Sequence, residues 1–545
     1  MLSRVLPDPD SLSLAQQVAQ MVVVRASGHL FDHEIAYPQW EATHSQLRHY
    51  LDELGVGGVI FLGGSAAELA LKVQMLQGWS PIPLLLAADI EEGVGQRFSG
   101  ATWFPPPMAL GEIAQHNLPR ALAYAEQLGR TTALEAASLG LNWILAPVAD
   151  VNNNPANPVI NVRAFGETPE LVTALARAFI KGCRSYPVLT TAKHFPGHGD
   201  TATDSHLRLP TIDHDLARLE AVELAPFRGL LASGDGRADT VMTAHLRLSA
   251  LDAQRPATLS PSVLDGLLRR DLGFRGLIVT DALVMGAITD TYGPYEAAVM
   301  AVEAGADVLL MPGDVAGCIT AVCEAVQIGR LSRDRIRQSV ERLWRAKHQV
   351  TAQVESGSTC HSWEAPQVAT QIQQLAQPAA QALVQDILHH SSRRGEAGFK
   401  PAAQGQNVVF VEDCLSCPQL SRTAPAVVAP QGWGYGLQLV DRRRPLPALT
   451  GLPTLVQLFI RGNPFRSGQG LLAMAQTYVQ SLMAAGELQA VILYGSHYGL
   501  EQLQLPASLP WVFSYGQMPA AQAQALSLLL GNGLASGALD SSFTD

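Results

Sequence analysis

Eight short apolar runs recur along the first 314 residues, and longer amphipathic stretches separate them. The runs lie at 21–24, 56–64, 83–89, 141–150, 188–195, 239–246, 276–283 and 306–314. The intervening stretches, such as 168–182 and 295–305, have helical spacing, and several of them begin with Ser, Thr or Pro and end with Gly. Eight strand–helix repeats predict an α/β fold of the TIM (β/α)8-type barrel. An open doubly wound sheet is the alternative, although no GxGxxG turn follows the first run.

The composition changes after about residue 350. Only 20 of the last 195 residues are charged, and Gln and Ala become frequent. Four further strand-like runs follow, at 407–413, 453–460, 489–495 and 510–516, with helix-like stretches between them. We therefore expect a barrel domain over 1–350, a connecting helix and linker over 351–400, and a smaller α/β sandwich domain over 401–545.

The overall charge makes a nucleic-acid partner unexpected. The chain of 545 residues carries a formal net charge of −11, and Arg442–Arg444 is its longest basic run. No stretch reaches the roughly 20 apolar residues of a membrane-spanning helix. Pro and Asp residues at 7–10 interrupt the region where a signal peptide needs an apolar core, so we expect a cytoplasmic protein without a membrane partner.

The six cysteines are too few for a disulfide framework in so long a chain, and we expect reduced thiols. Cys414 and Cys417 form a C-x-x-C pair. No second pair accompanies them to complete a zinc ribbon, so a metal or redox role is the less favoured interpretation.

Polar residues stand at the carboxyl ends of the predicted strands, where a barrel builds its active site. They are Asp89, Asp150, Lys193, His194, His245, Asp281 and Asp314. Asp is also a common helix N-cap, so position alone does not select the residues that take part in a reaction.

The densest polar cluster follows the fifth strand, in the segment KHFPGHGDTATDSH at 193–206. A divalent metal site is one interpretation, but the spacing of its histidines matches no common zinc arrangement and Lys193 would repel the cation. A second interpretation is structural, with His194 and His198 bonded to buried carbonyl groups. Acid/base chemistry is the third and favoured one, with no metal and no cofactor.

One pair within this cluster suits proton transfer. Asp204 and His206 are separated by one residue, so on an extended loop the carboxylate can orient the imidazole. Asp281, at the end of the seventh strand, is then positioned to act as a nucleophile. A carboxylate nucleophile paired with a proton donor is the arrangement of retaining glycoside hydrolysis, whereas a helix cap is the alternative role for Asp281.

At these residues the sequence resembles glycoside hydrolase family 3, and within it the bacterial β-N-acetylglucosaminidases. The segment at 193–206 is similar to the signature of that subgroup, and AADIEEGVGQRF (87–98), NVRAFG (161–166) and VTDALVMGAI (279–288) are similar to other family segments. The resemblance covers about residues 15–350. It implies that Asp281 is the nucleophile and that Asp204 and His206 form the acid/base dyad. It also implies a set of residues that bind sugar hydroxyls or lie beside them, namely Asp89, Arg97, Arg163, Lys193 and His194.

The resemblance implies a retaining, exo-acting enzyme that hydrolyses terminal β-linked N-acetylhexosamine from small carbohydrates such as cell-wall fragments. One departure is the sequence Glu91-Glu92-Gly93, where the family usually has E-G-G. The alternatives are a phosphorylase, because some relatives resemble phosphorylases, a β-glucosidase of the same family, a metal-dependent hydrolase and a carbohydrate-binding barrel without activity.

Overall fold

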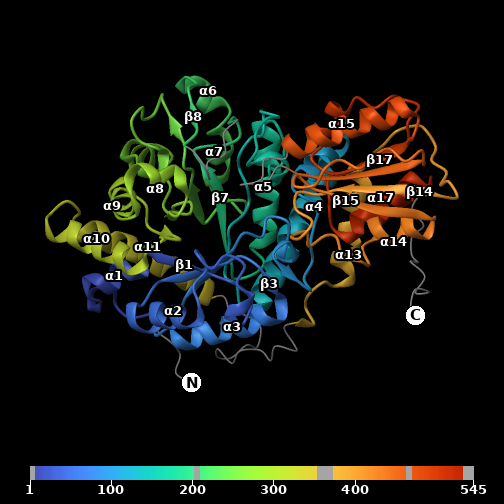
Figure 1. Cartoon of the computed structure of the whole chain (residues 1–545). Helices are drawn as coiled ribbons and strands as arrows, with labels where there is room; N and C mark the ends of the chain where they lie inside the picture. The colour runs from blue at the N-terminus through green and yellow to red at the C-terminus, as the bar shows by residue number, and fades with distance from the viewer. Residues whose placement is uncertain (1–5, 202–208, 353–371, 462–468, 532–545) are drawn as a thin grey trace. The chain divides into compact units, whose positions relative to one another are not determined.

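The computed structural model describes residues 6–201, 209–352, 372–461 and 469–531. Within it the chain divides into two compact units, Met1–Leu383 and Val384–Asp545 (Figure 1). Among the described residues, no helix is long and apolar enough to cross a bilayer.

The first unit is a barrel of eight parallel strands, as the eight apolar runs predict. The strands are β1 (Val22–Ala26), β2 (Gly58–Phe61), β4 (Leu85–Ala88), β6 (Trp143–Ile144), β7 (Leu189–Phe195), β9 (Thr240–Thr243), β11 (Leu277–Val279) and β12 (Leu309–Leu310). They pair in the order β11-β9-β7-β6-β4-β2-β1-β12. A bridge between Val279 and Val308 joins the two end strands. The TIM-type barrel is therefore confirmed.

Helices follow the strands and surround the barrel (Figure 1). They are α2 (His44–Arg48), α3 (Ala66–Trp79), α4 (Met108–Ser138), α5 (Pro169–Cys183), α6 (Leu216–Ala221), α7 (Ala225–Leu231), the helix Ser262–Asp271, α8 (Gly286–Tyr292), α9 (Pro294–Ala304), α10 (Val315–Gln327) and α11 (Arg333–Ala352), with α1 (Leu14–Gln20) before β1. The sequence places one helix at 118–140, whereas α4 begins at Met108. A kink at Asn117, next to Pro119, separates this additional first segment from the predicted helix.

Side chains fill the interior of the barrel, so it is a packed core and not a pore. Trp143 is fully buried, and its indole Nε1 donates hydrogen bonds to Thr191 Oγ1 (2.9 Å) and Thr240 Oγ1 (3.1 Å). Below the start of β12, the buried Asp307 carboxylate forms ion pairs with Arg269, Arg335 and Arg342. These contacts hold β12 to the outer helices, so the carboxyl ends of the strands rest on a rigid base.

The second unit has the predicted α/β architecture, but its sheet has six strands where the sequence indicates four. Its order is β13-β18-β17-β16-β14-β15, and all of its pairs are parallel except that of the edge strand β13. The elements are α13 (Pro378–Ser391), β13 (Arg393–Arg394), β14 (Gly405–Phe410), α14 (Pro425–Gly432), β15 (Tyr435–Val440), β16 (Thr454–Ile460), α15 (Gln469–Ala485), β17 (Leu488–Gly495), α16 (Tyr498–Leu503), β18 (Trp511–Ser514) and α17 (Pro519–Leu529). Figure 1 shows α15 and α14 on opposite sides of this sheet.

Candidate active site

Lys193 is the central cation at the mouth of the barrel. It stands near the end of β7, its side chain is 1% exposed, and its Nζ lies 2.7 Å from Asp89 Oδ1 and 2.7 Å from Glu91 Oε1. Both carboxylates follow β4. Burial would raise the pKa of Asp89, but Lys193 and Arg97 outweigh burial and hold that pKa below its ordinary value. Asp89 is therefore an anion at neutral pH.

Arg163 is joined to the same cluster through Glu91. Its Nε and Nη2 donate to the two oxygens of the Glu91 carboxylate at 2.9 and 2.7 Å, in the paired geometry that favours arginine. Burial would raise the pKa of Glu91, but Arg163 and Lys193 bring it well below its ordinary value. Arg97 completes the group, since its Nε donates to the backbone oxygen of Asp89 at 3.0 Å.

His194 and His198 share the carboxylate of Asp150. His194 Nδ1 lies 2.7 Å from Asp150 Oδ2, and the backbone N–H of His198 donates to Asp150 Oδ1 at 2.7 Å. The imidazole of His198 itself contacts Thr201 Oγ1 at 3.0 Å. The structural interpretation of these histidines named buried carbonyl groups as partners, whereas His194 Nδ1 has a carboxylate partner and His198 Nδ1 a hydroxyl partner.

Asp281 stands at the mouth of the barrel, just after the seventh strand. It follows β11, is half-buried, and accepts a hydrogen bond from the backbone N–H of Ala282 at 2.7 Å. Burial lowers the pKa of His198 to about 4, while the charges of Asp150 and Asp281 act in the opposite direction. Asp281 lies at the same end of the barrel as the Lys193 cluster, because all parallel strands of a barrel end at one mouth.

Glu92, the residue that departs from the family pattern, has its own partner. Its side chain is buried, and the indole Nε1 of Trp103 donates to its carboxylate at 2.9 Å. Gly93 retains the left-handed conformation, with φ of +84°, that glycine adopts without strain. The additional carboxylate is therefore accommodated by Trp103 without loss of the turn that positions Asp89 and Glu91.

Asp204 and His206 lie outside the described residues, so their geometry forms no part of this site description. The flanking residues are well fixed. Asn157 Nδ2 donates to the backbone oxygens of His198 and Gly199, both at 2.8 Å, and Asp200 lies 2.8 Å from His214 Nε2.

Within the described ranges there are two groups of three side chains that lie close enough together to bind a metal ion. One group is His29, Glu34 and Glu68, and the other is Asp200, His214 and Glu223. Neither group contains His194 or His198, but Asp200 of the 193–206 segment belongs to the second group.

Glu91 and Asp150 contact the predicted site residues, although the sequence assigned no role to Glu91 and placed Asp150 only among the polar residues at the strand ends. Glu91 joins Lys193 to Arg163, and Asp150 joins His194 to the His198 backbone. A signal for them existed. The predicted site contained three cations and one sugar-binding carboxylate, and buried cations require further anionic partners.

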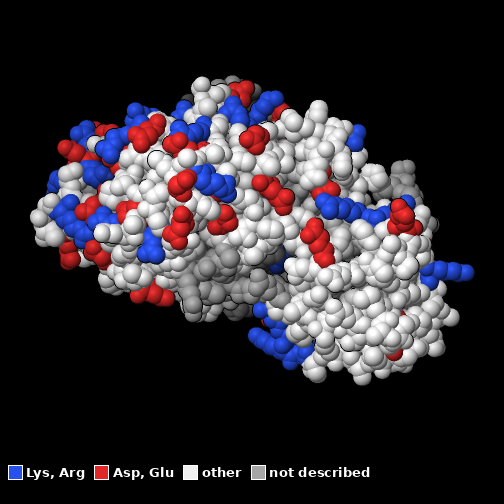
Figure 2. Space-filling view, turned by 90° about the horizontal axis from the view of Figure 1, so that it is seen from above, with Lys and Arg blue, Asp and Glu red and all other residues white. Residues whose placement is uncertain are grey.

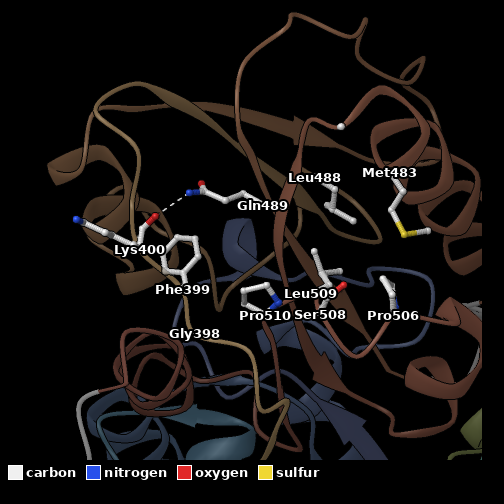
Figure 3. Close-up of a pocket in the computed structure, with 11 residues that line it drawn as sticks. Gly398, Phe399, Lys400, Met483, Leu488, Gln489, Pro506, Ser508, Leu509 and Pro510 are labelled. Atoms are coloured by element: carbon white, nitrogen blue, oxygen red, sulfur yellow. Dashed lines mark hydrogen bonds between the residues drawn. The ribbon is translucent and has the colours of Figure 1, made fainter.

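An open cavity lies elsewhere, in the second unit. It has a volume of about 520 Å³ and lies between the segment at 398–400 and the starts of β17 and β18 (Figure 3). Gln489 Nε2 donates to the backbone oxygen of Lys400 at 2.8 Å, and its Oε1 accepts from the Tyr435 hydroxyl. None of the predicted site residues lines this cavity.

On the face seen in Figure 2, acidic and basic side chains are intermixed over much of the surface. Where both signs alternate, no extended basic path forms on that face for a phosphate backbone.

Several known proteins that resemble this chain in sequence or structure are named beta-hexosaminidase or beta-N-acetylglucosaminidase. The chain is 34% identical over 333 residues to beta-hexosaminidase A of Pseudoalteromonas piscicida, a match that spans 55% of each chain. It is 38% identical over 269 residues to a beta-hexosaminidase of Methylococcus capsulatus, covering 48% of this chain and 78% of that protein. A solved glycoside hydrolase family 3 beta-N-acetylglucosaminidase from Paenibacillus is 30% identical, with a TM-score of 0.76 over 96% of this chain and 97% of that one.

The family models match both units. Residues 13–346 match the glycosyl hydrolase family 3 N-terminal domain, and residues 398–531 match the bacterial glycosyl hydrolase family 3 C-terminal domain. The matched ranges contain the strands of the barrel and the parallel strands of the second sheet. The chain therefore belongs to glycosyl hydrolase family 3.

Proposed function

We propose that the chain is a retaining, exo-acting β-N-acetylglucosaminidase, which removes a terminal β-linked N-acetylhexosamine from a small carbohydrate. The observation that carries this proposal is the Lys193 cluster at the mouth of the barrel, where two carboxylates and two cations are held in direct contact. Such fixed, alternating donors and acceptors suit the vicinal hydroxyl groups of a sugar. The names of the β-hexosaminidase relatives support the N-acetylhexosamine class.

The exposures of the three carboxylates suggest which of them binds substrate. The Asp89 side chain is 24% exposed, whereas those of Glu91 and Asp150 are 3% and 0% exposed. In our proposal Asp89 accepts hydrogen bonds from sugar hydroxyls, and Glu91 and Asp150 position the cations and imidazoles around it. Arg97, Arg163, Lys193 and His194 donate to the same sugar ring.

The proposed reaction has two steps. In the first, Asp281 forms a bond to the anomeric carbon while the bond to the leaving oxygen breaks, and His206, oriented by Asp204, gives that oxygen a proton. In the second, water attacks the anomeric carbon, the Asp281 ester bond breaks, and the water proton passes to His206. Two inversions give net retention.

A paired assay tests the substrate class. We expect the protein to hydrolyse nitrophenyl β-N-acetylglucosaminide much faster than nitrophenyl β-glucoside, and early proton NMR spectra of the product to show the β anomer. A preference for the glucoside would assign a β-glucosidase instead. Release of α product would exclude the two-step displacement. The sequence also predicts cell-wall fragments as the natural substrate and a cytoplasmic location, and both remain predictions.

A further inference from the structure

The loop that follows β1 presents aromatic rings to solvent at the active-site end of the barrel. It runs over 27–43, between β1 and α2. Phe31 is 61% exposed and Tyr37 is 45% exposed, although large apolar rings are usually covered. Tyr37 and Trp40 lie nearly parallel, with ring centroids 6.0 Å apart and an interplanar angle of 24°. The two rings thus form one aromatic surface.

Arg25 holds this aromatic pair in place from below. Its guanidinium lies 5.2 Å from the centre of the Tyr37 ring and 5.4 Å from that of Trp40, within cation–π range. The Glu41 carboxylate lies 3.7 Å from Arg25 Nη2 and accepts a hydrogen bond from the backbone N–H of Tyr37 at 3.1 Å. A surface held in this way loses little freedom when a ligand binds.

Trp40, one ring of this pair, lines a small cavity beside the segments that follow β11 and β12. A small cavity of about 70 Å³ is lined by Arg25, Trp40, Val284 and Met311, among other residues. Val284 follows Asp281 by three residues, and Met311 follows β12 with an unusual φ of +52°. The loop therefore forms the wall of the mouth between the Asp281 strand and the Asp89 strand.

We propose that Tyr37 and Trp40 form a binding platform for the second sugar of the substrate, the ring whose oxygen leaves when the terminal N-acetylhexosamine is released. The occupant is a pyranose ring of a β-linked N-acetylhexosamine oligosaccharide. Its C–H face packs on the aromatic surface, while its hydroxyl and acetamido groups point to water. This inference rests on the proposed function, and it makes short oligosaccharides better substrates than glycosides with a small leaving group.

Two substrates separate this platform from the reaction itself. N,N′-diacetylchitobiose has a second sugar ring, whereas N-acetyl-β-glucosaminyl fluoride has no ring beyond the cleaved bond. We expect Tyr37→Ala and Trp40→Ala each to lower kcat/KM on the disaccharide by about fivefold, in the range of a lost aromatic contact, and to leave the fluoride unchanged. Trp40→Phe should restore most of the loss.

Phe31→Ala is the matched control. It removes an exposed aromatic ring from the same loop, but Phe31 stacks on His33 and is not part of the Tyr37–Trp40 pair. Both substrates should be turned over as by the unchanged protein. An equal loss on both substrates with Tyr37→Ala and Trp40→Ala, or no loss on the disaccharide, would overturn the platform.

A binding measurement keeps this inference distinct from the proposed reaction. Calorimetric titration of diacetylchitobiose into the full chain carrying Asp281→Asn should give an affinity that Tyr37→Ala weakens about fivefold. If the disaccharide binds but neither the fluoride nor the nitrophenyl glycoside is turned over by the unchanged protein, the proposed function fails while the platform stands. If Tyr37→Ala leaves the affinity unchanged, the platform fails.

Discussion

Lys193 Nζ lies 2.7 Å from Glu91 Oε1, and the two side chains are 1% and 3% exposed. The pair is thus removed from water. A buried ion pair contributes stability only when each of its charges has further partners. Asp89 is the second partner of Lys193, and Arg163 is the second partner of Glu91. Through these contacts one buried carboxylate fixes two of the cations that we assign to sugar binding.

Glu91→Gln tests this arrangement. The substitution keeps the shape of the side chain and removes its charge, so two buried cations lose their shared anion. We expect the free energy of unfolding at pH 7 to fall by about 3 kcal/mol, as for other broken buried pairs. We also expect kcat/KM to fall, because Lys193 and Arg163 lose their fixed positions. Urea unfolding and steady-state kinetics measure the two effects.

The matched control is Glu126→Gln. Glu126 pairs with Lys181 at 2.9 Å, but the two side chains are 32% and 53% exposed, so the loss should stay below about 1 kcal/mol. The two variants should also differ in pH dependence. Because the pKa of Glu91 is depressed in the folded state, its stabilising effect is present above the unfolded pKa near 4.5 and disappears as the pH falls through the lower folded value. A deficit of Glu91→Gln that did not shrink in acid would contradict the ionic role.

Asp281→Asn is predicted to leave the fold intact and to lower kcat by roughly 10⁴-fold or more, because an amide cannot form the glycosyl ester. Circular dichroism and urea unfolding check the fold, and the nitrophenyl N-acetylglucosaminide assay checks turnover. Asp314→Asn is the control, since Asp314 also ends a barrel strand segment but caps α10 by accepting from the Gly317 N–H at 3.0 Å. Because Asn caps a helix about as well as Asp, that variant should keep its stability to within about 0.5 kcal/mol and keep its turnover. Comparable turnover in the two variants would contradict the nucleophile role and would indicate that Asp281 is a helix cap.

The barrel could be predicted from sequence because each of its strands is enclosed by helices outside and packed side chains inside, so it is a short continuous apolar run. Two strands of the second unit lacked this signal. β15 is an edge strand with Gly436 and Gln438 in its middle, and only its end residues are buried. β13 consists of two arginines, Arg393 and Arg394, on the other edge. Neither strand has an apolar run to recognise.

The sequence also predicted the site only in part. Position at the end of a strand predicted Asp89, Lys193 and Asp281 at one mouth, because all barrel strands end there, and the structure shows Asp89 in contact with Lys193. Spacing does not reveal which carboxylate a cation contacts, since that depends on side-chain direction across strands. The contacts of Glu91 with both Lys193 and Arg163 therefore emerged only from the structure.

The acid/base role of His206 predicts a dependence on the leaving group. His206→Ala should slow hydrolysis of diacetylchitobiose by roughly 10²–10⁴-fold, because a sugar alkoxide leaves poorly without a proton. Release of nitrophenol, which needs little protonation, should be slowed far less in the first step. Asp204→Asn should show the same pattern to a smaller degree. The measurement is kcat/KM on both substrates, and equal slowing of the two would refute the acid role.

Water and phosphate are competing acceptors for the glycosyl ester. A histidine in place of a second carboxylate leaves the pocket with less negative charge during the second step, so an anion can approach. We still predict hydrolysis as the main reaction, with free N-acetylglucosamine released at similar rates in phosphate and in a non-nucleophilic buffer of equal ionic strength. Chromatography of the products distinguishes the two outcomes. Glycosyl phosphate as the main product would make the protein a phosphorylase.

His198 predicts a specific pH dependence of stability. Burial lowers the pKa of its imidazole to about 4 in the folded state, against about 6.5 when the chain is unfolded. Between these values the unfolded chain binds a proton that the folded chain does not, so stability must fall as the pH decreases from 6.5 toward 4. The single site accounts for at most about 3 kcal/mol over that interval.

His198→Gln removes this titration and retains the backbone N–H that donates to Asp150 Oδ1. Urea unfolding at pH 7, 6 and 5 should therefore show a smaller loss of stability in the variant than in the unchanged protein, because all other titrating groups are common to both. NMR titration of the His198 ring gives the folded pKa directly. Parallel stability curves, or a ring that titrates near pH 6.5, would show that His198 is hydrated and that the site is more open than its contacts imply.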